Sequence, residues 1–166
     1  MKDFFNVATP AEVLAIIHEF EPLSTETVPT TDALGRILAK DVSSPVNLPH
    51  FDRATMDGFA LQASETTGAS ESSAIQFEFV GDVKMGEVPD FKIESDHAAK
   101  IPTGGMLPEG ANAVVMDEYA SFAGSNTLQI TRGAAPYENV VQVGQDIKNG
   151  DTVNVMCDSK KMYDIL

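Results

Sequence analysis

Apolar residues recur at helical spacing near the start of the chain. They predict one apolar helix face and comprise Val13, Ile16, Ile17 and Phe20. The stretch Thr9-Pro10-Ala11-Glu12 supplies an N-cap hydroxyl, a proline at the first helical position and a glutamate that completes a capping box. Glu21-Pro22 is expected to end this helix, because proline cannot continue it.

A second, shorter helix is predicted over residues 32–39. Leu34, Ile37 and Leu38 fall at helical spacing and are expected to face inward. Gly35 lies inside this stretch and weakens the helical pattern.

The pattern changes to strand-like alternation after residue 73. Ile75, Phe77 and Phe79 fall on one side of a predicted half-buried strand, and Leu128 and Ile130 repeat the pattern. The short apolar runs 113–116 and 140–143 predict two further strands, residues 122–126 a hairpin loop, and residues 62–73 a loop. The chain is thus expected to be mixed and mainly β, with a helical beginning and a β-rich body from about residue 74 to 155. Because long crossover helices are missing, an antiparallel or mixed sheet is favoured.

Composition narrows the classes of partner. The formal net charge of −14 at pH 7 argues against a nucleic-acid partner and against an anionic membrane surface. The single cysteine, Cys157, rules out an internal disulfide and fits a reducing compartment. No apolar run is long enough for a membrane span, and the N-terminus lacks a secretion signal, so we expect a cytoplasmic location.

The segment LPHFDRATMDGFA at residues 48–60 concentrates chemically active side chains without any helical or strand period. It contains Asp52, Arg53 and Asp57, followed by the conformationally permissive Gly58. Such a segment is typical of a surface loop that carries function on a rigid scaffold, although an ordinary turn has the same local composition.

Two further polar clusters follow. In IPTGGMLPEG at residues 101–110, the glycines after Thr103 allow close backbone approach, so their N–H groups can form an anion-binding concavity; a tight turn between strands is the simpler alternative. In VGQDIKNGD at residues 143–151, Asp146 and Asp151 lie between glycines, but their spacing does not match a calcium loop. His50 and His97 have no ligands at zinc spacing.

Taken in order, these clusters resemble the N-terminal region of the molybdopterin molybdenumtransferase family, which includes bacterial MoeA and the E domain of gephyrin. Five segments are similar to family motifs, and they are collinear over nearly the whole chain: residues 32–42, 48–60, 80–86, 99–118 and 144–151. The sequence departs from the family pattern at Ala54, Gly105, Asn112 and Gln145, and residues 156–166 do not resemble the family.

The resemblance implies two lobes. A β-rich outer lobe of residues 49–145 would be inserted into a mixed α/β base lobe of residues 1–48 plus 146–166. The family's larger α/β domain, which grips the pterin, and its small C-terminal β domain have no counterpart in this sequence, so we expect these 166 residues alone to be inactive.

The resemblance also implies a reaction, in which molybdate is inserted into adenylylated molybdopterin with release of AMP and with a divalent metal such as Mg²⁺. Asp57, Thr103 and Asp146 match residues that line the family's active-site cleft. Gly58, Gly104 and Arg53 are expected to bind substrate, and Asp57 and Asp146 to hold the metal. Asp146 can be a second metal ligand or a general base, and the sequence does not separate these roles.

The family also implies partners. A homodimer is expected, with the molybdopterin adenylyltransferase and molybdoenzyme apoproteins as further partners. The alternative to an enzyme segment is a non-catalytic dimerisation or scaffolding module derived from the same family.

Overall fold

The computed structural model describes residues 8–21 and 24–153, and its contacts divide the chain into two compact units. One unit contains the described residues up to Asp41, and the other spans Val42–Val153. The lobe boundaries predicted at residues 48/49 and 145/146 stay a prediction, and residues 154–166 of the predicted base lobe lie outside the described residues. No helix within the described ranges is long and apolar enough to cross a membrane.

The first unit contains the predicted N-terminal helix, α1 (Pro10–His18), and a 3₁₀ turn, η1 (Thr30–Asp32). The capping box is confirmed: Glu12 N donates to Thr9 Oγ1 (3.3 Å), and Thr9 N donates to Glu12 Oε2 (2.6 Å). The cap satisfies two donors that the first helical turn leaves without a partner.

The second helix, predicted over residues 32–39, is wrong. The 3₁₀ turn η1 ends at its C-cap Ala33, and Gly35 two residues later adopts a left-handed backbone with φ of 77°. Leu34, Ile37 and Leu38 are exposed rather than facing a core. The apolar spacing therefore predicted a helix where the glycine turns the backbone away from one.

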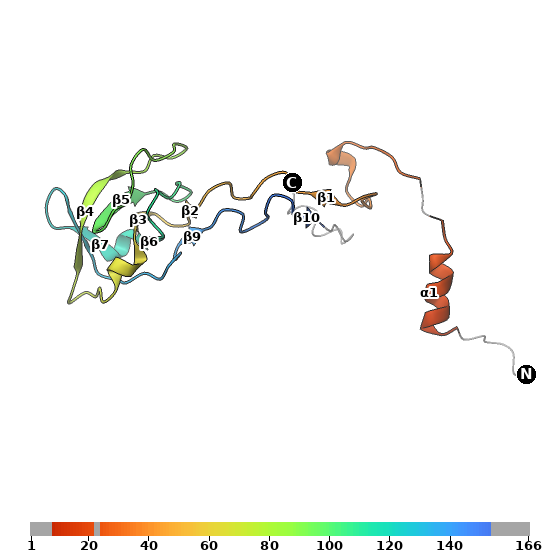
Figure 1. Cartoon of the computed structure of the whole chain (residues 1–166), viewed down its shortest axis with the longest axis horizontal. Coiled ribbons are helices and arrows are strands. Elements are labelled where there is room, and N and C mark those ends of the chain that lie inside the picture. The colour runs from red at the N-terminus through yellow and green to blue at the C-terminus, as the bar shows by residue number, and fades with distance from the viewer. Residues whose placement is uncertain (1–7, 22–23, 154–166) are drawn as a thin grey trace, which may run out of the picture. The chain divides into compact units, whose positions relative to one another are not determined.

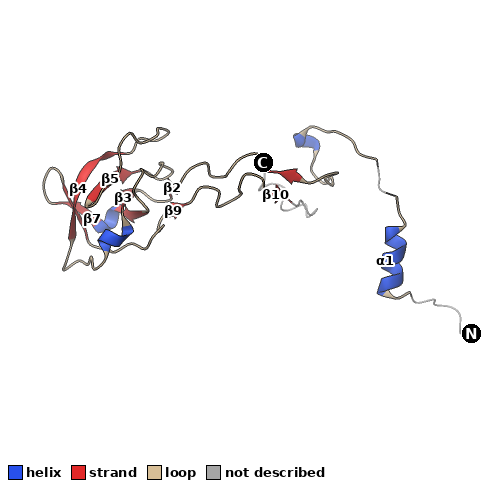
Figure 2. Ribbon diagram, in the orientation of Figure 1, coloured by secondary structure: helices blue, strands red, loops and turns tan. Residues whose placement is uncertain are grey.

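The second unit is built on a six-stranded sheet with the order β6-β3-β5-β4-β8-β7 (Figures 1 and 2). The strands are β3 (Gly58–Leu61), β4 (Ile75–Asp82), β5 (His97–Ile101), β6 (Ala113–Met116), β7 (Ala120–Phe122) and β8 (Thr127–Ile130). Within this sheet only the β4–β5 pair is parallel, so the sheet is mixed, one of the two forms predicted. Two 3₁₀ turns accompany the sheet, η2 (Ala63–Thr66) and η3 (Asp117–Tyr119).

The sheet curls around its main core. Phe59 on β3 contacts Phe122 on β7 edge to face, at 5.9 Å between ring centroids, although the two strands are far apart in the strand order. The core inside the curl contains Phe59, Leu61, Ala63, Phe77, Ala98, Ala113, Val115, Leu128 and Ile130. A second core lies on the other face of the sheet, with Ala54, Ala60, Val83, Ile101, Val114 and Val140. The central strands are therefore buried on both faces.

Two short antiparallel ladders lead into and out of this sheet. One pairs β1 (Val42–Ser43) with β10 (Thr152–Val153), and the other pairs β2 (Arg53–Ala54) with β9 (Val140–Val141). The apolar run 140–143 thus forms a shorter strand than predicted. The ladders hold the motif at 48–60 beside the segment 140–151.

Candidate functional site

The ends of three adjacent strands meet at one edge of the sheet. Because β3 runs antiparallel to both β5 and β6, Gly58 at the start of β3 lies opposite Ile101 at the end of β5 and Met116 at the end of β6. Asp57 directly precedes β3, and Thr103 follows β5 by two residues. The topology therefore gathers residues from three distant parts of the sequence at this edge.

Asp57 and Thr103 are joined directly. The backbone N and the Oγ1 of Thr103 both donate to Asp57 Oδ1, at 2.7 and 2.9 Å. No donor among the described residues is bonded to the other carboxylate oxygen, Oδ2. Thr103 thus fixes the orientation of the carboxylate and leaves one oxygen available to a ligand.

These two bonds lower the pKa of Asp57 below its ordinary value of 3.8. The backbone bond from Thr103 is the largest cause, the hydroxyl bond the second, and the charge of Lys100 a smaller contribution in the same direction. The carboxylate is therefore ionised at neutral pH, as a metal ligand or a base must be.

The sign of this pKa shift predicts how acid affects folding. A depressed folded-state pKa stabilises the fold above the unfolded value of about 3.8, and this contribution disappears as the pH falls through the folded-state pKa. We expect the Asp57 carboxyl, followed by NMR, to titrate nearer 3.8 in Thr103→Val than in the unmodified chain. Thr131→Val is the matched control, because Thr131 Oγ1 donates to Tyr119 O instead. An identical titration in Thr103→Val and the unmodified chain would contradict this prediction.

Of the two alternatives for residues 103–105, the structure favours the tight turn over the anion-binding concavity, because all three N–H groups are used within the chain. Thr103 N donates to Asp57, Gly104 N to Ala54 O (2.8 Å) and Gly105 N to Pro102 O (2.9 Å). Gly104 adopts a φ of 83°, which explains the need for glycine in this turn. The loop therefore holds the Asp57 carboxylate in place, and none of these three positions offers an unpaired backbone N–H group.

Gly58 has a structural requirement of its own. A Cβ at this position would lie 2.0 Å from the carbonyl oxygen of Val115 on the neighbouring strand β6. Only glycine allows the two strands to approach this closely, and the approach places Asp57 at the shared edge.

Asp146 joins the motif at a different place. Its backbone N donates to Leu48 O (2.9 Å), and Gly144 N donates to Pro49 O (2.9 Å), so the third cluster is held against the first residues of the motif. Asp146 is exposed, and within residues 8–21 and 24–153 no hydrogen bond or ion pair links its carboxylate to Asp57 or Thr103. Nor do these ranges contain a group of three or more histidine, cysteine or acidic side chains that could hold a metal.

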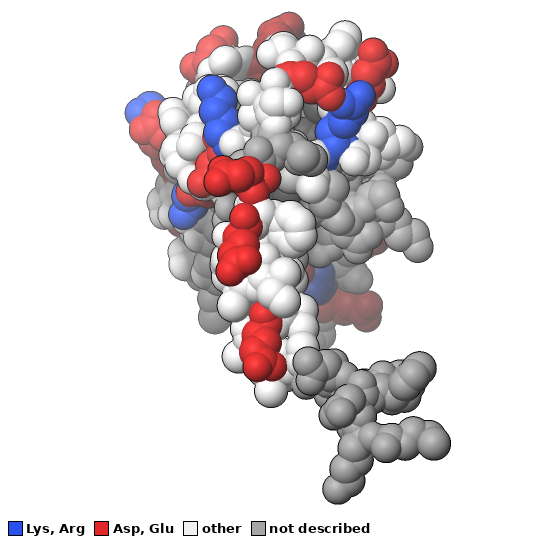
Figure 3. Space-filling view, turned by 90° about the vertical axis from the view of Figure 1, so that its right-hand side faces the viewer, with Lys and Arg blue, Asp and Glu red and all other residues white. Residues whose placement is uncertain are grey.

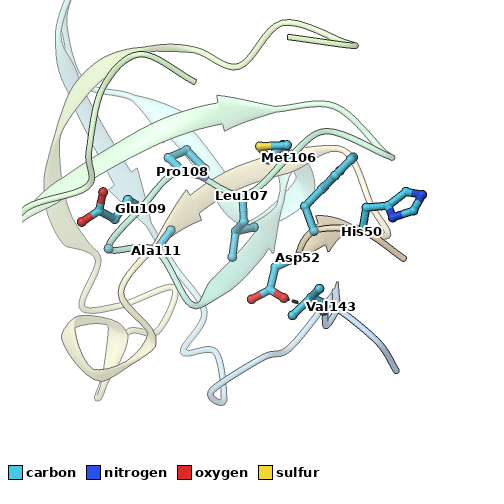
Figure 4. A pocket seen from close by; sticks show the side chains of 10 residues that line it. His50, Asp52, Met106, Leu107, Pro108, Glu109, Ala111 and Val143 are labelled. Atoms are coloured by element: carbon cyan, nitrogen blue, oxygen red, sulfur yellow. Dashed lines mark hydrogen bonds between the residues drawn. The ribbon is translucent and has the colours of Figure 1, made fainter. Parts of the chain in front are cut away.

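Arg53 is exposed on β2, opposite Val141, and its backbone also bridges to Met106. It lies beside a shallow pocket of about 420 Å³ that does not include Asp57 or Thr103. Figure 4 shows this pocket, where His50, Asp52, Leu107 and Val143 line the opening, with Asp52 Oδ1 accepting from Val143 N at 2.6 Å. This bond gives Asp52, the first acidic residue of the motif, a structural role.

Sequence reasoning missed Lys100 and Asp117. Lys100 lies on β5 opposite Phe59, with its Nζ 4.8 Å from the centre of the Phe59 ring, and it forms an ion pair with Asp117. Asp117 directly follows β6, and its N donates to Asp57 O at 3.3 Å. Ala98 and Lys100 are two residues apart on β5 and so share the face toward the curl, but that strand was not predicted from the sequence.

Comparison with known proteins places this fold and motif set in one family, that of the MoeA N-terminal region. The sequence pattern described as the MoeA N-terminal region, domains I and II, matches residues 8–155. The chain belongs to this family.

Its relatives are longer proteins. A molybdopterin molybdenumtransferase of Haemophilus influenzae is 35% identical over 132 residues, covering 80% of this chain and 31% of the relative, and that of Bacillus subtilis is 32% identical over 144 residues, covering 85% and 34%. A crystal structure of a molybdopterin biosynthesis MoeA protein from Pyrococcus horikoshii OT3 superposes with a TM-score of 0.70 at 36% identity, covering 78% of this chain and 34% of that one. The chain thus spans about a third of the length of the relatives it matches.

Proposed function

We propose that this chain forms the N-terminal part of a molybdenum insertase in molybdenum cofactor biosynthesis. The reaction would insert molybdate into adenylylated molybdopterin and release AMP. The observation that carries the proposal is the Asp57–Thr103 pair, an ionised carboxylate that is held through one oxygen and open at the other. Family membership supports the same reaction, because the relatives are named molybdopterin molybdenumtransferases.

The donor set fits Mg²⁺. This ion usually keeps several waters and binds one or two protein carboxylates together with substrate phosphates, so it does not need the three-acid cage that the described residues lack. Asp57 would hold it through Oδ2, and the ion would neutralise phosphate charge when bound. Asp146, which joins the motif at a different place, is proposed as a second carboxylate. Thr103 keeps the Asp57 carboxylate oriented and ionised, and Gly104 and Gly58 give the backbone the shape that places it.

The 166 residues are proposed to be inactive alone, because the remaining two thirds of the relatives supply the rest of the site. The test replaces the matching part of the B. subtilis relative with residues 8–155 and measures AMP release from adenylylated molybdopterin with molybdate and Mg²⁺. We expect turnover by this chimera and none by the 166-residue chain. Turnover by the chain alone, or a folded chimera without activity, would contradict the proposal.

An exposed apolar helix face favours a second role, in association. No residue of α1 is buried, and the face predicted to be its core side is open to solvent, with exposed fractions of 44% for Val13, 53% for Ile16 and 54% for Ile17, and of 74% for Phe20 just beyond the helix. A stripe of this kind marks an interaction site. We propose that a second copy of the chain covers it, as expected for a dimerisation module.

Light scattering after size exclusion tests this role. We expect twice the 17.8 kDa chain mass, and a monomer once Ile16 and Ile17 are both replaced by Asp. The matched control places Asp at Ala11 and Ala15 of the same helix, which adds the same charge and leaves the dimer intact. A monomeric unmodified chain would exclude the dimerisation role without affecting the enzymatic proposal.

A further inference from the structure

The edge of the sheet where Asp57 and Thr103 meet lacks an obvious contact for an anion. The proposed substrates are anionic, the chain carries a formal net charge of −14, and the backbone N–H groups of residues 103–105 are already bonded within the chain. Figure 3, which views the chain from the end where α1 lies, shows a column of acidic side chains and no continuous basic patch on the visible described residues. Neutralisation of an oxyanion at this edge must therefore come from a bound metal or from a particular side chain.

Lys100 is placed to supply that charge. Its ammonium reaches from β5 across the Phe59 ring of β3 to Asp117 at the end of β6, and so crosses the three strand ends that gather Asp57 and Thr103. Its side chain is 35% exposed and that of Asp117 is 45% exposed, so solvent and small solutes reach the pair. The effect of Lys100 on the pKa of Asp57 agrees with this proximity.

We propose that Lys100 is an oxyanion-binding residue of this site, which exchanges its internal partner Asp117 for an oxygen of a bound tetrahedral anion. The inference rests on the proposed function, because it assigns a contact for molybdate or for the substrate phosphate. An ammonium has three donors and no acceptor, so it can turn from a carboxylate to a substrate oxygen without losing its place over the Phe59 ring. In the free protein, Asp117 keeps the ammonium at the edge.

The ion pair between Lys100 and Asp117 predicts in which direction each substitution should change the oxyanion affinity. Replacing Asp117 by Asn removes the competing carboxylate, so oxyanion affinity should rise about threefold, which corresponds to the loss of an exposed ion pair. Replacing Lys100 by Met should weaken binding about tenfold, as expected for loss of a charge-assisted hydrogen bond. Lys100→Arg keeps the charge and should retain binding.

The experiment titrates the full 166-residue chain with sodium molybdate, inorganic phosphate or AMP in separate series, each with Mg²⁺, and follows the amide NMR signals of Thr103 and Asp117. Preference for molybdate identifies the metal oxyanion as the ligand, and preference for AMP identifies the substrate phosphate. Lys92→Met controls for the loss of an ion-paired lysine, since Lys92 pairs with Glu109 outside this edge, and Glu118→Gln controls for the loss of an acid beside Asp117. Both controls should bind like the unmodified chain.

Two results would overturn the proposal: no saturable shift in the unmodified chain with any of the three anions, or equal affinity in Lys100→Met. If Lys100→Met fails to fold, Asp117→Asn still tests the proposal. An oxyanion affinity that is unchanged or weaker in Asp117→Asn would contradict the idea that Asp117 competes with the anion for Lys100. If the ion pair between Lys100 and Asp117 had only a structural role, the substitutions would lower the free energy of unfolding and leave the oxyanion affinities unchanged. Since the chain is tested by binding and the chimera by AMP release, either proposal can fail alone.

Discussion

Asp57→Asn in the active chimera is expected to lower the rate of AMP release about 100-fold or more, the scale of a lost catalytic base or carboxylate ligand. Asparagine keeps the shape of the side chain and can still accept the two bonds from Thr103 through its carbonyl oxygen. It removes only the negative charge and replaces the open carboxylate oxygen with an amide nitrogen. The change in the rate of AMP release therefore measures what the Oδ2 oxygen contributes, because the hydrogen bonds that hold the side chain in place are kept.

Asp52→Asn provides the matched control. Asp52 belongs to the same motif, but its carboxylate accepts from Val143 N beside a different pocket, so its loss should change AMP release by less than about threefold. Equal losses in the two variants would mean that the motif acts only as a structural unit. Full activity of Asp57→Asn would remove Asp57 from the proposed site.

Gly58→Ala is expected to destabilise the second unit by roughly 3 kcal/mol or more, at the upper end of the cost of overpacking. The added Cβ would lie 2.0 Å from Val115 O and 2.8 Å from Val115 C, and both are backbone atoms that cannot rotate away. β3 and β6 would have to separate across four paired positions. Urea denaturation followed by fluorescence or circular dichroism measures the loss of free energy of unfolding.

Gly68→Ala separates crowding from backbone preference. Gly68 has a φ of 88°, and no atom lies within 4 Å of the position that a Cβ would take, so alanine there should cost only about 1 kcal/mol through the left-handed conformation. If Gly58→Ala unfolds no earlier in urea than Gly68→Ala, the close approach of β3 and β6 is not a requirement of the fold.

The parts of the fold that could be predicted are those with a clear apolar period. Alternation indicated β4 and β8, an apolar run indicated β6, and the capping signals indicated α1, all of which are confirmed. The central strands β3 and β5 escaped prediction because both of their faces are buried, which removes the alternation of apolar and polar positions. In β3, Phe59 faces one core and Ala60 the other.

The candidate site was predictable in part, and for a similar reason. Asp57 and Thr103 stood out as motif residues, but their hydrogen bond depends on strand pairing between segments 46 residues apart. The N–H groups of residues 103–105 bond to Asp57, Ala54 and Pro102, and these partners, which rule out an anion-binding concavity there, could not be read from the glycine pattern. Lys100 carries no motif signal, because its importance comes from the strand opposite and the turn beyond it.

The β1–β10 ladder has a consequence for how this region can be moved between proteins. Val42 pairs with Val153 and Ser43 with Thr152, so the chain enters and leaves the second unit side by side, about 5 Å apart at each paired position. A segment with adjacent ends can be spliced into a surface turn of an unrelated host without stretching either partner. Residues 42–153 therefore have the geometry of a transferable insert, which would carry the Asp57 edge, and with it the proposed site residues Asp57 and Thr103, into a new host.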